Sequence, residues 1–521
     1  MRLIASCFIA SCLALPVQAA SVDITVDPKV KHPPIAPEIY GQFAEHLGYG
    51  IYDGIWVGPE SDIPNVRGIR SDVVDALKDI EVPVVRWPGG CFADEYHWRD
   101  GIGPRGERPV RKNNWWGGVE ETNAFGTHEF FDFAEQIGAK TYLSVNVASS
   151  TPTEMREWIE YLTSDNQDDL ANERRANGRE QPFQLDYVGI GNESWGCGGA
   201  MRPEYYSDLY RRWAAFFHKN GGGFHNNNDN KAVRVASGAN NLDTNWTYVV
   251  TKNAGPMMDA ISLHFYTLNQ GNWPSRNELT ATQIDQQAWH EIVFQANRMD
   301  EVLLAHEGVL DANDPDKRIA LYVDEWGTWY RPEPGHEPSF LLQQNTLRDA
   351  VTAALTLNIF HNHTERVKMA NIAQAVNVLQ AMLLTDGPAM AKTPTYHVFH
   401  MYKDFQGATP VGLAFESPRI THGDDTYPAI SASAATTQEG TMLIGLVNAD
   451  PVNGHEVTFD LGVRGQLLGA KVLTHDKMNA HNVPGQPADV EPAAFTNAKM
   501  KGSQLIVDMP SKSVVVLRLA I

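Results

Sequence analysis

The stretch "DYVGIGNESWGCGG", residues 186–199, holds a run of β-forming residues that ends at Gly-Asn-Glu. The run from Asp186 to Gly191 predicts a buried strand, and the glycines and tryptophan behind it predict that the strand stops there. Glu193 is therefore placed directly after the end of a strand. A carboxylate in that position indicates a polar site, and the rest of the chain indicates which kind.

Seven further runs have the same strand character, and helical stretches such as 71–80 and 127–138 lie between them, opening with the capping residues Ser71 and Thr127. The eight predicted strands are 38–45, 82–90, 140–147, 187–193, 233–240, 260–266, 318–326 and 367–374. Eight strands that alternate with helices over roughly 360 residues predict an α/β fold, a (β/α)₈ TIM barrel. Two polar stretches, 162–182 and 220–231, are predicted to be exposed loops.

The pattern changes near residue 402, where short strand-like runs broken by Gly, Asn, Asp and Pro begin. They predict a C-terminal all-β sandwich, jelly-roll-like, over 402–521, while the barrel occupies 35–401. Residues 20–34 contain the short run "VDITVD", which we expect to join the sandwich and bring the two chain ends together.

The first 19 residues combine an early arginine, an apolar run and a small-residue cleavage pattern, which predicts a secretory signal peptide cut after Ala19. Ordinary cleavage is favoured over lipoprotein processing because the apolar stretch continues beyond Cys12. No later segment is long and apolar enough to cross a bilayer. We therefore expect a secreted or periplasmic protein.

Net charge bears on the kind of partner that the protein binds, and cysteine content bears on disulfides and metal sites. The 521 residues carry a formal net charge of −21, which argues against nucleic acid or an anionic membrane and favours a neutral ligand. Two of the four cysteines lie in the leader, so Cys91 and Cys197 remain. The compartment permits a disulfide, and two buried thiols are the alternative. Neither CxxC spacing nor a Cys/His cluster indicates a metal, and no cofactor is expected.

Polar residues gather at the predicted strand ends, where a barrel of this kind places its ligand site. They are Glu45, Arg86, Asn146, Asn192, Glu193, His264, Tyr266, Glu325 and Gln374. Glu193 in "GIGNES" and Glu325 in "LYVDEWG" each follow an apolar strand, and Glu325 comes 132 residues later. That spacing is three βα units of about 44 residues, so the two fall on strands 4 and 7 and project into the mouth from opposite sides.

Paired carboxylates across a pocket are what glycoside hydrolysis requires, one as proton donor and one facing the anomeric carbon. A single strand-end glutamate is more often a salt-bridge or capping residue, but two at barrel strand ends beside polar aromatics favour catalysis. His264 and Tyr266 have the alternative interpretation of hydrogen-bonded core residues. Arg86 is harder to explain in that way, because a buried arginine needs a carboxylate partner.

Several long, ordered motifs resemble the α-L-arabinofuranosidases of glycoside hydrolase family 51, over about residue 22 to the C-terminus. They are "IYGQFAEHLGYGIYDGIWVG", "VVRWPGGCFADEYHWRDGIGP", "ETNAFGTHEF", "GNESWGCGG" and "NIAQAVNVLQ". The resemblance implies a barrel with a β-sandwich, and a retaining, two-step mechanism without metal or cofactor. It also implies a homo-oligomer.

By position, the resemblance implies that Glu193 is the general acid/base and Glu325 the nucleophile. The residues expected to bind the sugar or orient these carboxylates are Glu45, Arg86, Cys91, Trp116 rather than Trp115, Asn192, His264, Tyr266 and Gln374. Asn146 has no clear role in the family and is taken as structural.

One departure from the family lies in "PGGCF", where many members have Asn in place of Cys91. We hypothesise a Cys91–Cys197 disulfide that shapes the −1 subsite, since both residues belong to loops at the barrel mouth.

The function that follows is removal of terminal α-L-arabinofuranosyl groups from arabinan, arabinoxylan or arabino-oligosaccharides. An endo-β-glucanase or another glycosidase on the same barrel is one alternative. A non-catalytic sugar-binding protein is the other, although such a protein would be expected to lack one of the two carboxylates.

Overall fold

The computed structural model describes residues 21–27, 32–217, 232–269 and 279–521. The predicted signal peptide at 1–19 and the predicted loop at 220–231 lie outside the described residues.

Eight parallel strands close into a barrel whose circular order follows the sequence. They are β2 (Gly41–Phe43), β5 (Val84–Trp87), β8 (Lys140–Val145), β9 (Tyr187–Ile190), β10 (Val233–Asn240), β11 (Ala260–Leu268), β12 (Ala320–Trp329) and β13 (Val367–Ala373). Each strand overlaps one of the eight predicted runs, and the predicted fold class is confirmed. The strands are apolar on both sides because they face a packed interior and an outer layer of helices.

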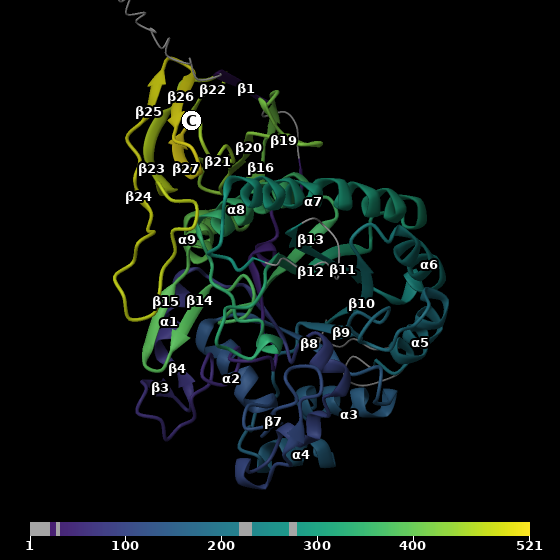
Figure 1. Cartoon of the computed structure of the whole chain (residues 1–521). Coiled ribbons are helices and arrows are strands. Elements are labelled where there is room, and N and C mark those ends of the chain that lie inside the picture. Colours follow the sequence, from purple (N-terminus) through teal and green to yellow (C-terminus); the bar gives the residue numbers. More distant parts are fainter. Residues whose placement is uncertain (1–20, 28–31, 218–231, 270–278) are drawn as a thin grey trace, which may run out of the picture.

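Helices surround the barrel in Figure 1. They are α1 (Ser71–Asp79), α2 (Thr127–Ile137), α3 (Pro152–Thr163), α4 (Asp169–Ala176), α5 (Pro203–Ala215), α6 (Thr244–Ala254), α7 (Gln286–Asn313), α8 (Leu347–Asn362) and α9 (Pro394–Tyr402). Among the helices described, none is long and apolar enough to cross a membrane.

Two local predictions about helices were wrong. Ser71 and Thr127 are the first helical residues and not the caps, which are Arg70 and Gly126. At α2 the Glu129 carboxylate accepts a hydrogen bond from the Gly126 backbone N–H (3.0 Å). The side chain at the third helical position therefore caps the backbone N–H of the N-cap residue.

The stretch 162–182, predicted to be an exposed loop, contains α4. Its Asp168 side chain accepts from the backbone N–H of Ala171 at 2.8 Å, which caps the helix. Arg174 is buried and donates to the carbonyls of Tyr161 and Ser164 at 2.9 and 2.6 Å. A polar segment is thus held by hydrogen bonds to main-chain carbonyls.

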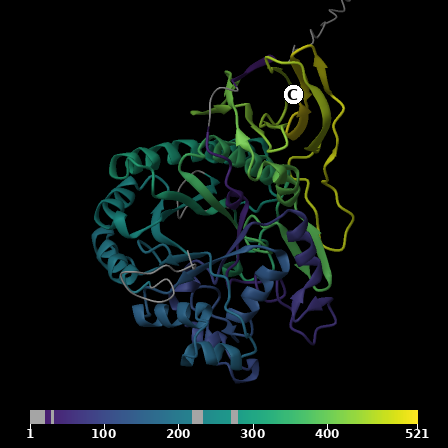
Figure 2. The same ribbon diagram turned by 180° about the vertical axis from the view of Figure 1, so that it is seen from behind.

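Two sheets form the second domain. The first contains β17 (Gly412–Ala414), β1 (Ser21–Asp27), β22 (His455–Asp460), β26 (Gln504–Met509) and β25 (Ala498–Lys501), in that order. The second contains β16 (Thr409–Pro410), β20 (Ile430–Thr436), β21 (Thr441–Asn448), β27 (Ser513–Ala520), β23 (Gln466–Thr474) and β24 (Ala493–Ala494). Both views place them at one side of the barrel (Figures 1 and 2).

Strand β1 comes from the N-terminus yet lies inside the first sheet, parallel to β22 and antiparallel to β17. Its side chains alternate strictly, and Val22, Ile24 and Val26 are buried against the sandwich core. The period of two matches a strand with one buried face.

Helix α8 joins the two domains. It is buried along almost its whole length, because the barrel covers one side and the sandwich the other. Ser433 Oγ donates to Asn358 Oδ1 (2.7 Å), and on α7 the Trp289 indole donates to the carbonyl of Ala449 (2.9 Å). These contacts seat the sandwich on the barrel.

If β1 is a structural part of the sandwich, Ile24→Ala should lower the free energy of unfolding by about 2–4 kcal/mol, because it removes buried methyl groups. Asp23→Ala, at the neighbouring exposed position, is the matched control and should change it by less than about 0.5 kcal/mol. Urea denaturation followed by circular dichroism measures both. Equal effects for the two variants would contradict the placement of β1.

Candidate active site

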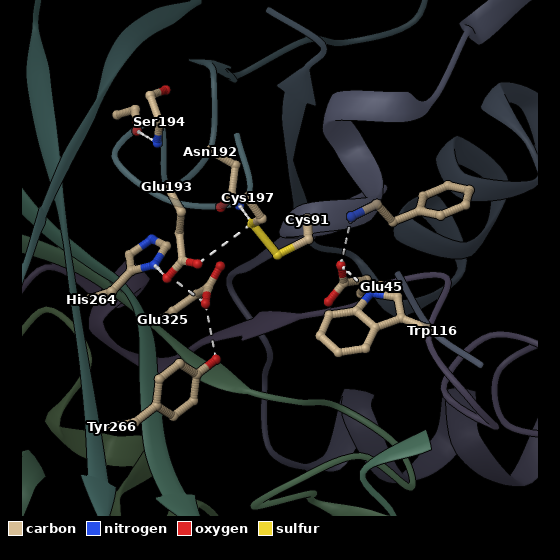
Figure 3. Close-up of a disulfide and its surroundings, with 12 residues drawn as sticks. Glu45, Cys91, Trp116, Asn192, Glu193, Ser194, Cys197, His264, Tyr266 and Glu325 are labelled. Carbon is tan, nitrogen blue, oxygen red and sulfur yellow. Dashed lines mark hydrogen bonds and ion pairs between the residues drawn. A yellow bond between two sulfur atoms is a disulfide. The ribbon is translucent and has the colours of Figure 1, made fainter. Parts of the chain in front are cut away.

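The polar residues predicted at strand ends meet at one end of the barrel, and Figure 3 draws most of them. Glu193 follows β9 and Glu325 lies on β12, and both reach toward His264 of β11. One carboxylate oxygen of Glu193, one of Glu325 and one ring nitrogen of His264 lie within 4.8 Å of one another. Carboxyl groups of retaining glycosidases stand at about this separation, roughly 5–5.5 Å.

A bulge in β12 sets the position of Glu325. The pairing with β11 moves from Ser262–Tyr322 to His264–Glu325, so β12 has one residue more than its neighbour there. The pairing with β13 shows the same shift. A bulge re-aims side chains, and here the consecutive residues Asp324 and Glu325 both contact Arg86.

Arg86 of β5 links the two sides of the site. Its guanidinium donates to Glu325 Oε1 at 2.8 Å and to Asn192 Oδ1 at 2.6 Å, and it lies over the Phe43 ring. Burial alone would lower the pKa of Arg86, but the charges of Asp324 and Glu325 raise it above its ordinary value. Arg86 is therefore a permanent buried cation that fixes the orientation of Glu325.

Glu325 receives a second donor from Tyr266, whose hydroxyl donates to Oε2 at 2.9 Å. Burial, with a smaller contribution from the charge of Glu193, raises the pKa of the Glu325 carboxyl above its ordinary value, although His264 and Arg86 act to lower it. The two cations therefore favour the ionised form that a nucleophile needs.

His264 contacts both glutamates through Nδ1, at 2.9 Å from Glu193 Oε1 and 3.3 Å from Glu325 Oε2. Burial alone would lower the pKa of His264. Glu325, Asp324 and Glu193 outweigh that effect and raise the pKa to about 10. The imidazole therefore carries a positive charge at neutral pH.

Glu45 lies across the site from Glu193, beside Trp116 (Figure 3). Its Oε1 accepts from the Trp116 indole (2.9 Å) and the Phe92 backbone N–H (3.0 Å), and Gln374 Nε2 donates to Oε2 (3.3 Å). Burial, and then the charge of Glu325, raise the pKa of Glu45 to about 7. A half-ionised carboxyl of this kind can both accept and donate hydrogen bonds.

A disulfide joins Cys91 and Cys197, and so ties the segment after β5 to the loop that carries Glu193. Figure 3 shows it between Glu193 and Glu45. Cys197 Sγ lies 3.6 Å from Glu193 Oε2, an ordinary contact because a disulfide sulfur has no proton to donate. The bond restrains the position of Glu193.

The glycines before Cys91 are required by close approach. A Cβ on Gly89 would lie 2.5 Å from the Glu45 side chain, and one on Gly90 would lie 3.1 Å from Glu325 Oε1. The "PGGC" motif thus lets the main chain pass directly beside two carboxylates.

Trp115 and Asn146, which were not expected to bind the sugar, differ from the residues around the two glutamates. Trp115 is 41% exposed, whereas Trp116 contacts Glu45. Asn146 donates to the Tyr96 carbonyl at 3.2 Å and to Ser149 Oγ at 2.8 Å, which suits a structural residue.

Two buried carboxyls escaped the sequence reasoning. Asp324 lies beside Arg86 and His264, but strict strand alternation would point it away from Glu325, and only the bulge brings it in. Asp94 is 2% exposed and accepts from the backbone N–H groups of Val147 and Ala148 at 3.1 and 3.3 Å. The sequence offered one indication of Asp94, its position three residues after Cys91 within a motif that resembles the family.

Two groups of side chains among the described residues have metal-ligand spacing, Cys91–Glu193–Cys197 and Glu193–His264–Glu325. In the first, both sulfurs belong to the disulfide and are not thiolates. In the second, both ring nitrogens of His264 already face carboxylate oxygens, Nδ1 toward Glu193 and Glu325 and Nε2 toward Asp324. The first set therefore lacks the thiolates that a soft metal prefers, and the second is an ion-paired cluster.

Known proteins resemble this chain over nearly its full length. A model of the α-L-arabinofuranosidase 1 domain matches residues 76–284, and a model of the α-L-arabinofuranosidase C-terminal domain matches residues 324–513. An intracellular exo-α-L-arabinofuranosidase of Bacteroides ovatus is 46% identical over 520 residues, 99% of each chain.

Two solved structures have the same architecture. The GH51 arabinofuranosidase of Xanthomonas axonopodis pv. citri superposes with a TM-score of 0.92 at 47% identity, over 96% of this chain and 99% of that one. The α-L-arabinofuranosidase of Thermotoga maritima, solved as an arabinose complex, gives 0.82 at 29% identity, over 95% and 99%.

The pKa of Glu45 makes stability depend on pH. The folded state holds the proton up to about pH 7, while the unfolded chain releases it near 4.5, so stability falls as pH rises through that window. Glu45→Gln removes this loss. Relative to the parent protein, the variant should therefore gain about 3 kcal/mol of unfolding free energy between pH 4.5 and pH 8.

Chemical denaturation of both proteins at pH 4.5 and pH 8 measures the gain. Glu135→Gln, at an exposed position, is the control for the substitution itself. The same difference between Glu45→Gln and the parent at both pH values would show that Glu45 is not perturbed.

Proposed function

We propose that this chain, which belongs to the α-L-arabinofuranosidases of glycoside hydrolase family 51, removes terminal α-L-arabinofuranosyl groups with retention of configuration. The observation that carries the proposal is the pair of carboxylates, Glu193 after β9 and Glu325 on β12, of which one oxygen each lies within 4.8 Å of the other. That spacing leaves room for one anomeric carbon and none for an intervening water, which suits a two-step displacement.

In the first step Glu325 attacks the anomeric carbon while Glu193 gives its proton to the leaving oxygen. Arg86 and Tyr266 hold the two Glu325 oxygens at 2.8 and 2.9 Å, so the attacking carboxylate has little freedom to rotate. In the second step Glu193 removes a proton from water, and the water releases the sugar from Glu325.

The remaining residues suit recognition of a small sugar ring. Glu45 and Gln374 offer hydrogen-bonding groups to hydroxyls, and Trp116, held by Glu45, offers an apolar face. Asn192 is oriented by Arg86 and can reach a hydroxyl next to the anomeric carbon.

Exo-action is supported by the Bacteroides ovatus relative, whose name specifies it. Arabinan, arabinoxylan side chains and arabino-oligosaccharides are the proposed substrates. An endo-β-glucanase would instead hydrolyse soluble cellulose, and a sugar-binding protein would turn over nothing. A homo-oligomer stays a prediction.

Export is a second proposal, supported by the leader pattern at 1–19 and by the disulfide, because disulfides persist in oxidising compartments. The Bacteroides ovatus relative is named intracellular, which favours the opposite location.

The two proposals make separate predictions. For catalysis, Glu325→Ala should lower kcat on an aryl α-L-arabinofuranoside by roughly 10⁴-fold or more, and Glu193→Ala by roughly 10²–10⁴-fold. Added azide distinguishes the roles. It should yield the β-glycosyl azide with Glu325→Ala after one displacement, and the α-glycosyl azide with Glu193→Ala after two.

Proton NMR of the azide product reads the configuration, and Glu135→Ala is the control for loss of an unrelated glutamate. An aryl β-glucoside and soluble cellulose should remain uncleaved by the parent protein. The same anomer from both variants, or turnover near the parental rate with Glu325→Ala, would refute the assignment.

For export, the protein recovered from the periplasm of a bacterial host should begin at Ala20. When denatured without reductant it should contain no reactive thiol, and after reduction two, as mass spectrometry and thiol titration measure. An intact leader in the cytoplasm would count against export, and two thiols before reduction would count against the disulfide.

A further inference from the structure

His264 faces three carboxylates from the middle of the site. Nδ1 lies 2.9 Å from Glu193 Oε1 and 3.3 Å from Glu325 Oε2, and Nε2 lies 3.2 Å from Asp324 Oδ1. The His264 side chain is 3% exposed, so water does not replace these partners. A neutral imidazole would direct a lone pair at a carboxylate oxygen on one side, whereas the doubly protonated ring turns an N–H toward the carboxylates on both sides.

Asp324 occupies the side of His264 that is turned away from the catalytic pair. It is 1% exposed and accepts from the Tyr142 hydroxyl at 2.7 Å, and its Oδ2 lies 3.7 Å from Arg86 Nε. Burial alone would raise the pKa of Asp324, but Arg86 and His264 lower it, so the carboxyl is ionised. The roles proposed above for the site leave this buried charge unused.

We propose that Asp324 is a positioning residue that keeps His264 doubly protonated, so that the Nδ1–H of His264 follows the negative charge from Glu325 to Glu193 and back during turnover. The inference rests on the proposed function, because it uses Glu193 as acid/base and Glu325 as nucleophile.

The movement of charge follows from the chemistry of the two steps. When Glu325 forms its bond to the anomeric carbon it loses its negative charge. The bond to the leaving oxygen breaks at the same time, and the proton of Glu193 goes to that oxygen, so the charge now resides on Glu193. Hydrolysis returns a proton from water to Glu193 and frees the Glu325 carboxylate.

Both charged states lie within reach of the same donor. Nδ1 of His264 hydrogen-bonds Glu193 Oε1 at 2.9 Å and lies within ion-pair distance of Glu325 Oε2 at 3.3 Å, so the two distances differ by less than half an ångström. His264 keeps both protons throughout, and the net charge of the cluster with Asp324 and Arg86 does not change. A donor that is already in place for both states needs little reorganisation.

Asp324→Asn tests the proposal. The substitution removes the negative charge that favours a proton on Nε2, so His264 loses its cationic form. A neutral His264 stabilises the Glu193 carboxylate poorly when Glu193 gives its proton to the leaving group. The kcat/KM should fall on the order of 10²-fold for an alkyl α-L-arabinofuranoside, whose departure requires a proton, but less than about 10-fold for a 2,4-dinitrophenyl one. A merely structural defect would lower both equally.

A double-mutant cycle tests whether Asp324 acts through His264. With the alkyl substrate, His264→Gln with Asp324→Asn should be no worse than His264→Gln alone, because the second change has nothing left to position. Tyr142→Phe is the matched control. It removes one hydrogen bond from Asp324 but leaves its charge, and should retain kcat/KM within about 3-fold for both leaving groups.

Multiplicative losses in the cycle, equal losses across leaving groups, or parental activity of Asp324→Asn would each overturn the proposal. Asp324→Ser, which is smaller, replaces the Asn variant should that one not fold, and the same outcomes apply. The parent protein and Glu325→Ala are measured beside them. If the parent cleaves no arabinofuranoside, the proposed function fails. If the parent behaves as proposed and only the Asp324 results disagree, the inference alone fails.

Discussion

Two buried cations, Arg86 and His264, are the constraint on which the site depends. A charge without a partner inside a protein is strongly unfavourable, so each cation requires carboxylates at close range. Glu325 and Asp324 supply them to both, at 2.8 to 3.7 Å. The same contacts that make the cations tolerable also set the orientation and protonation of the groups proposed for catalysis.

The scaffold supplies this geometry through departures from regular structure. A bulge in β12 directs the side chains of Asp324 and Glu325 toward the same two cations, Arg86 and His264. In a regular strand these consecutive side chains would point to opposite faces. Glu193 itself has a backbone φ of +40°, a left-handed conformation that is unfavourable for a glutamate. The Cys91–Cys197 disulfide restrains that loop, and the closed barrel holds the strands beneath it.

The sequence was sufficient to predict the features that repeat or alternate. Eight apolar runs at βα spacing predicted the barrel, and the short run "VDITVD" was expected to join the sandwich, where β1 lies. The strand-end residues could be predicted for the same reason, because parallel strands deliver their ends to one face.

What escaped prediction depends on single-residue geometry or on distant contacts. Asp324 required knowledge of the bulge, which has no signature in one sequence. The segment 162–182 is polar enough to predict a loop. Hydrogen bonds from the buried Arg174 to main-chain carbonyls nevertheless stabilise α4 there. The raised pKa of Glu45 depends on burial and then on the charge of Glu325, which is distant in sequence and adjacent only in the fold.

Methanolysis by the parent protein tests the central claim, that two carboxylates share one anomeric carbon, most directly. An aryl α-L-arabinofuranoside would be cleaved in buffer containing methanol, and the first methyl glycoside formed would be identified by proton NMR. Two successive displacements, with Glu325 as nucleophile, predict methyl α-L-arabinofuranoside. Methyl β-L-arabinofuranoside as the first product would mean a single displacement and would contradict the account.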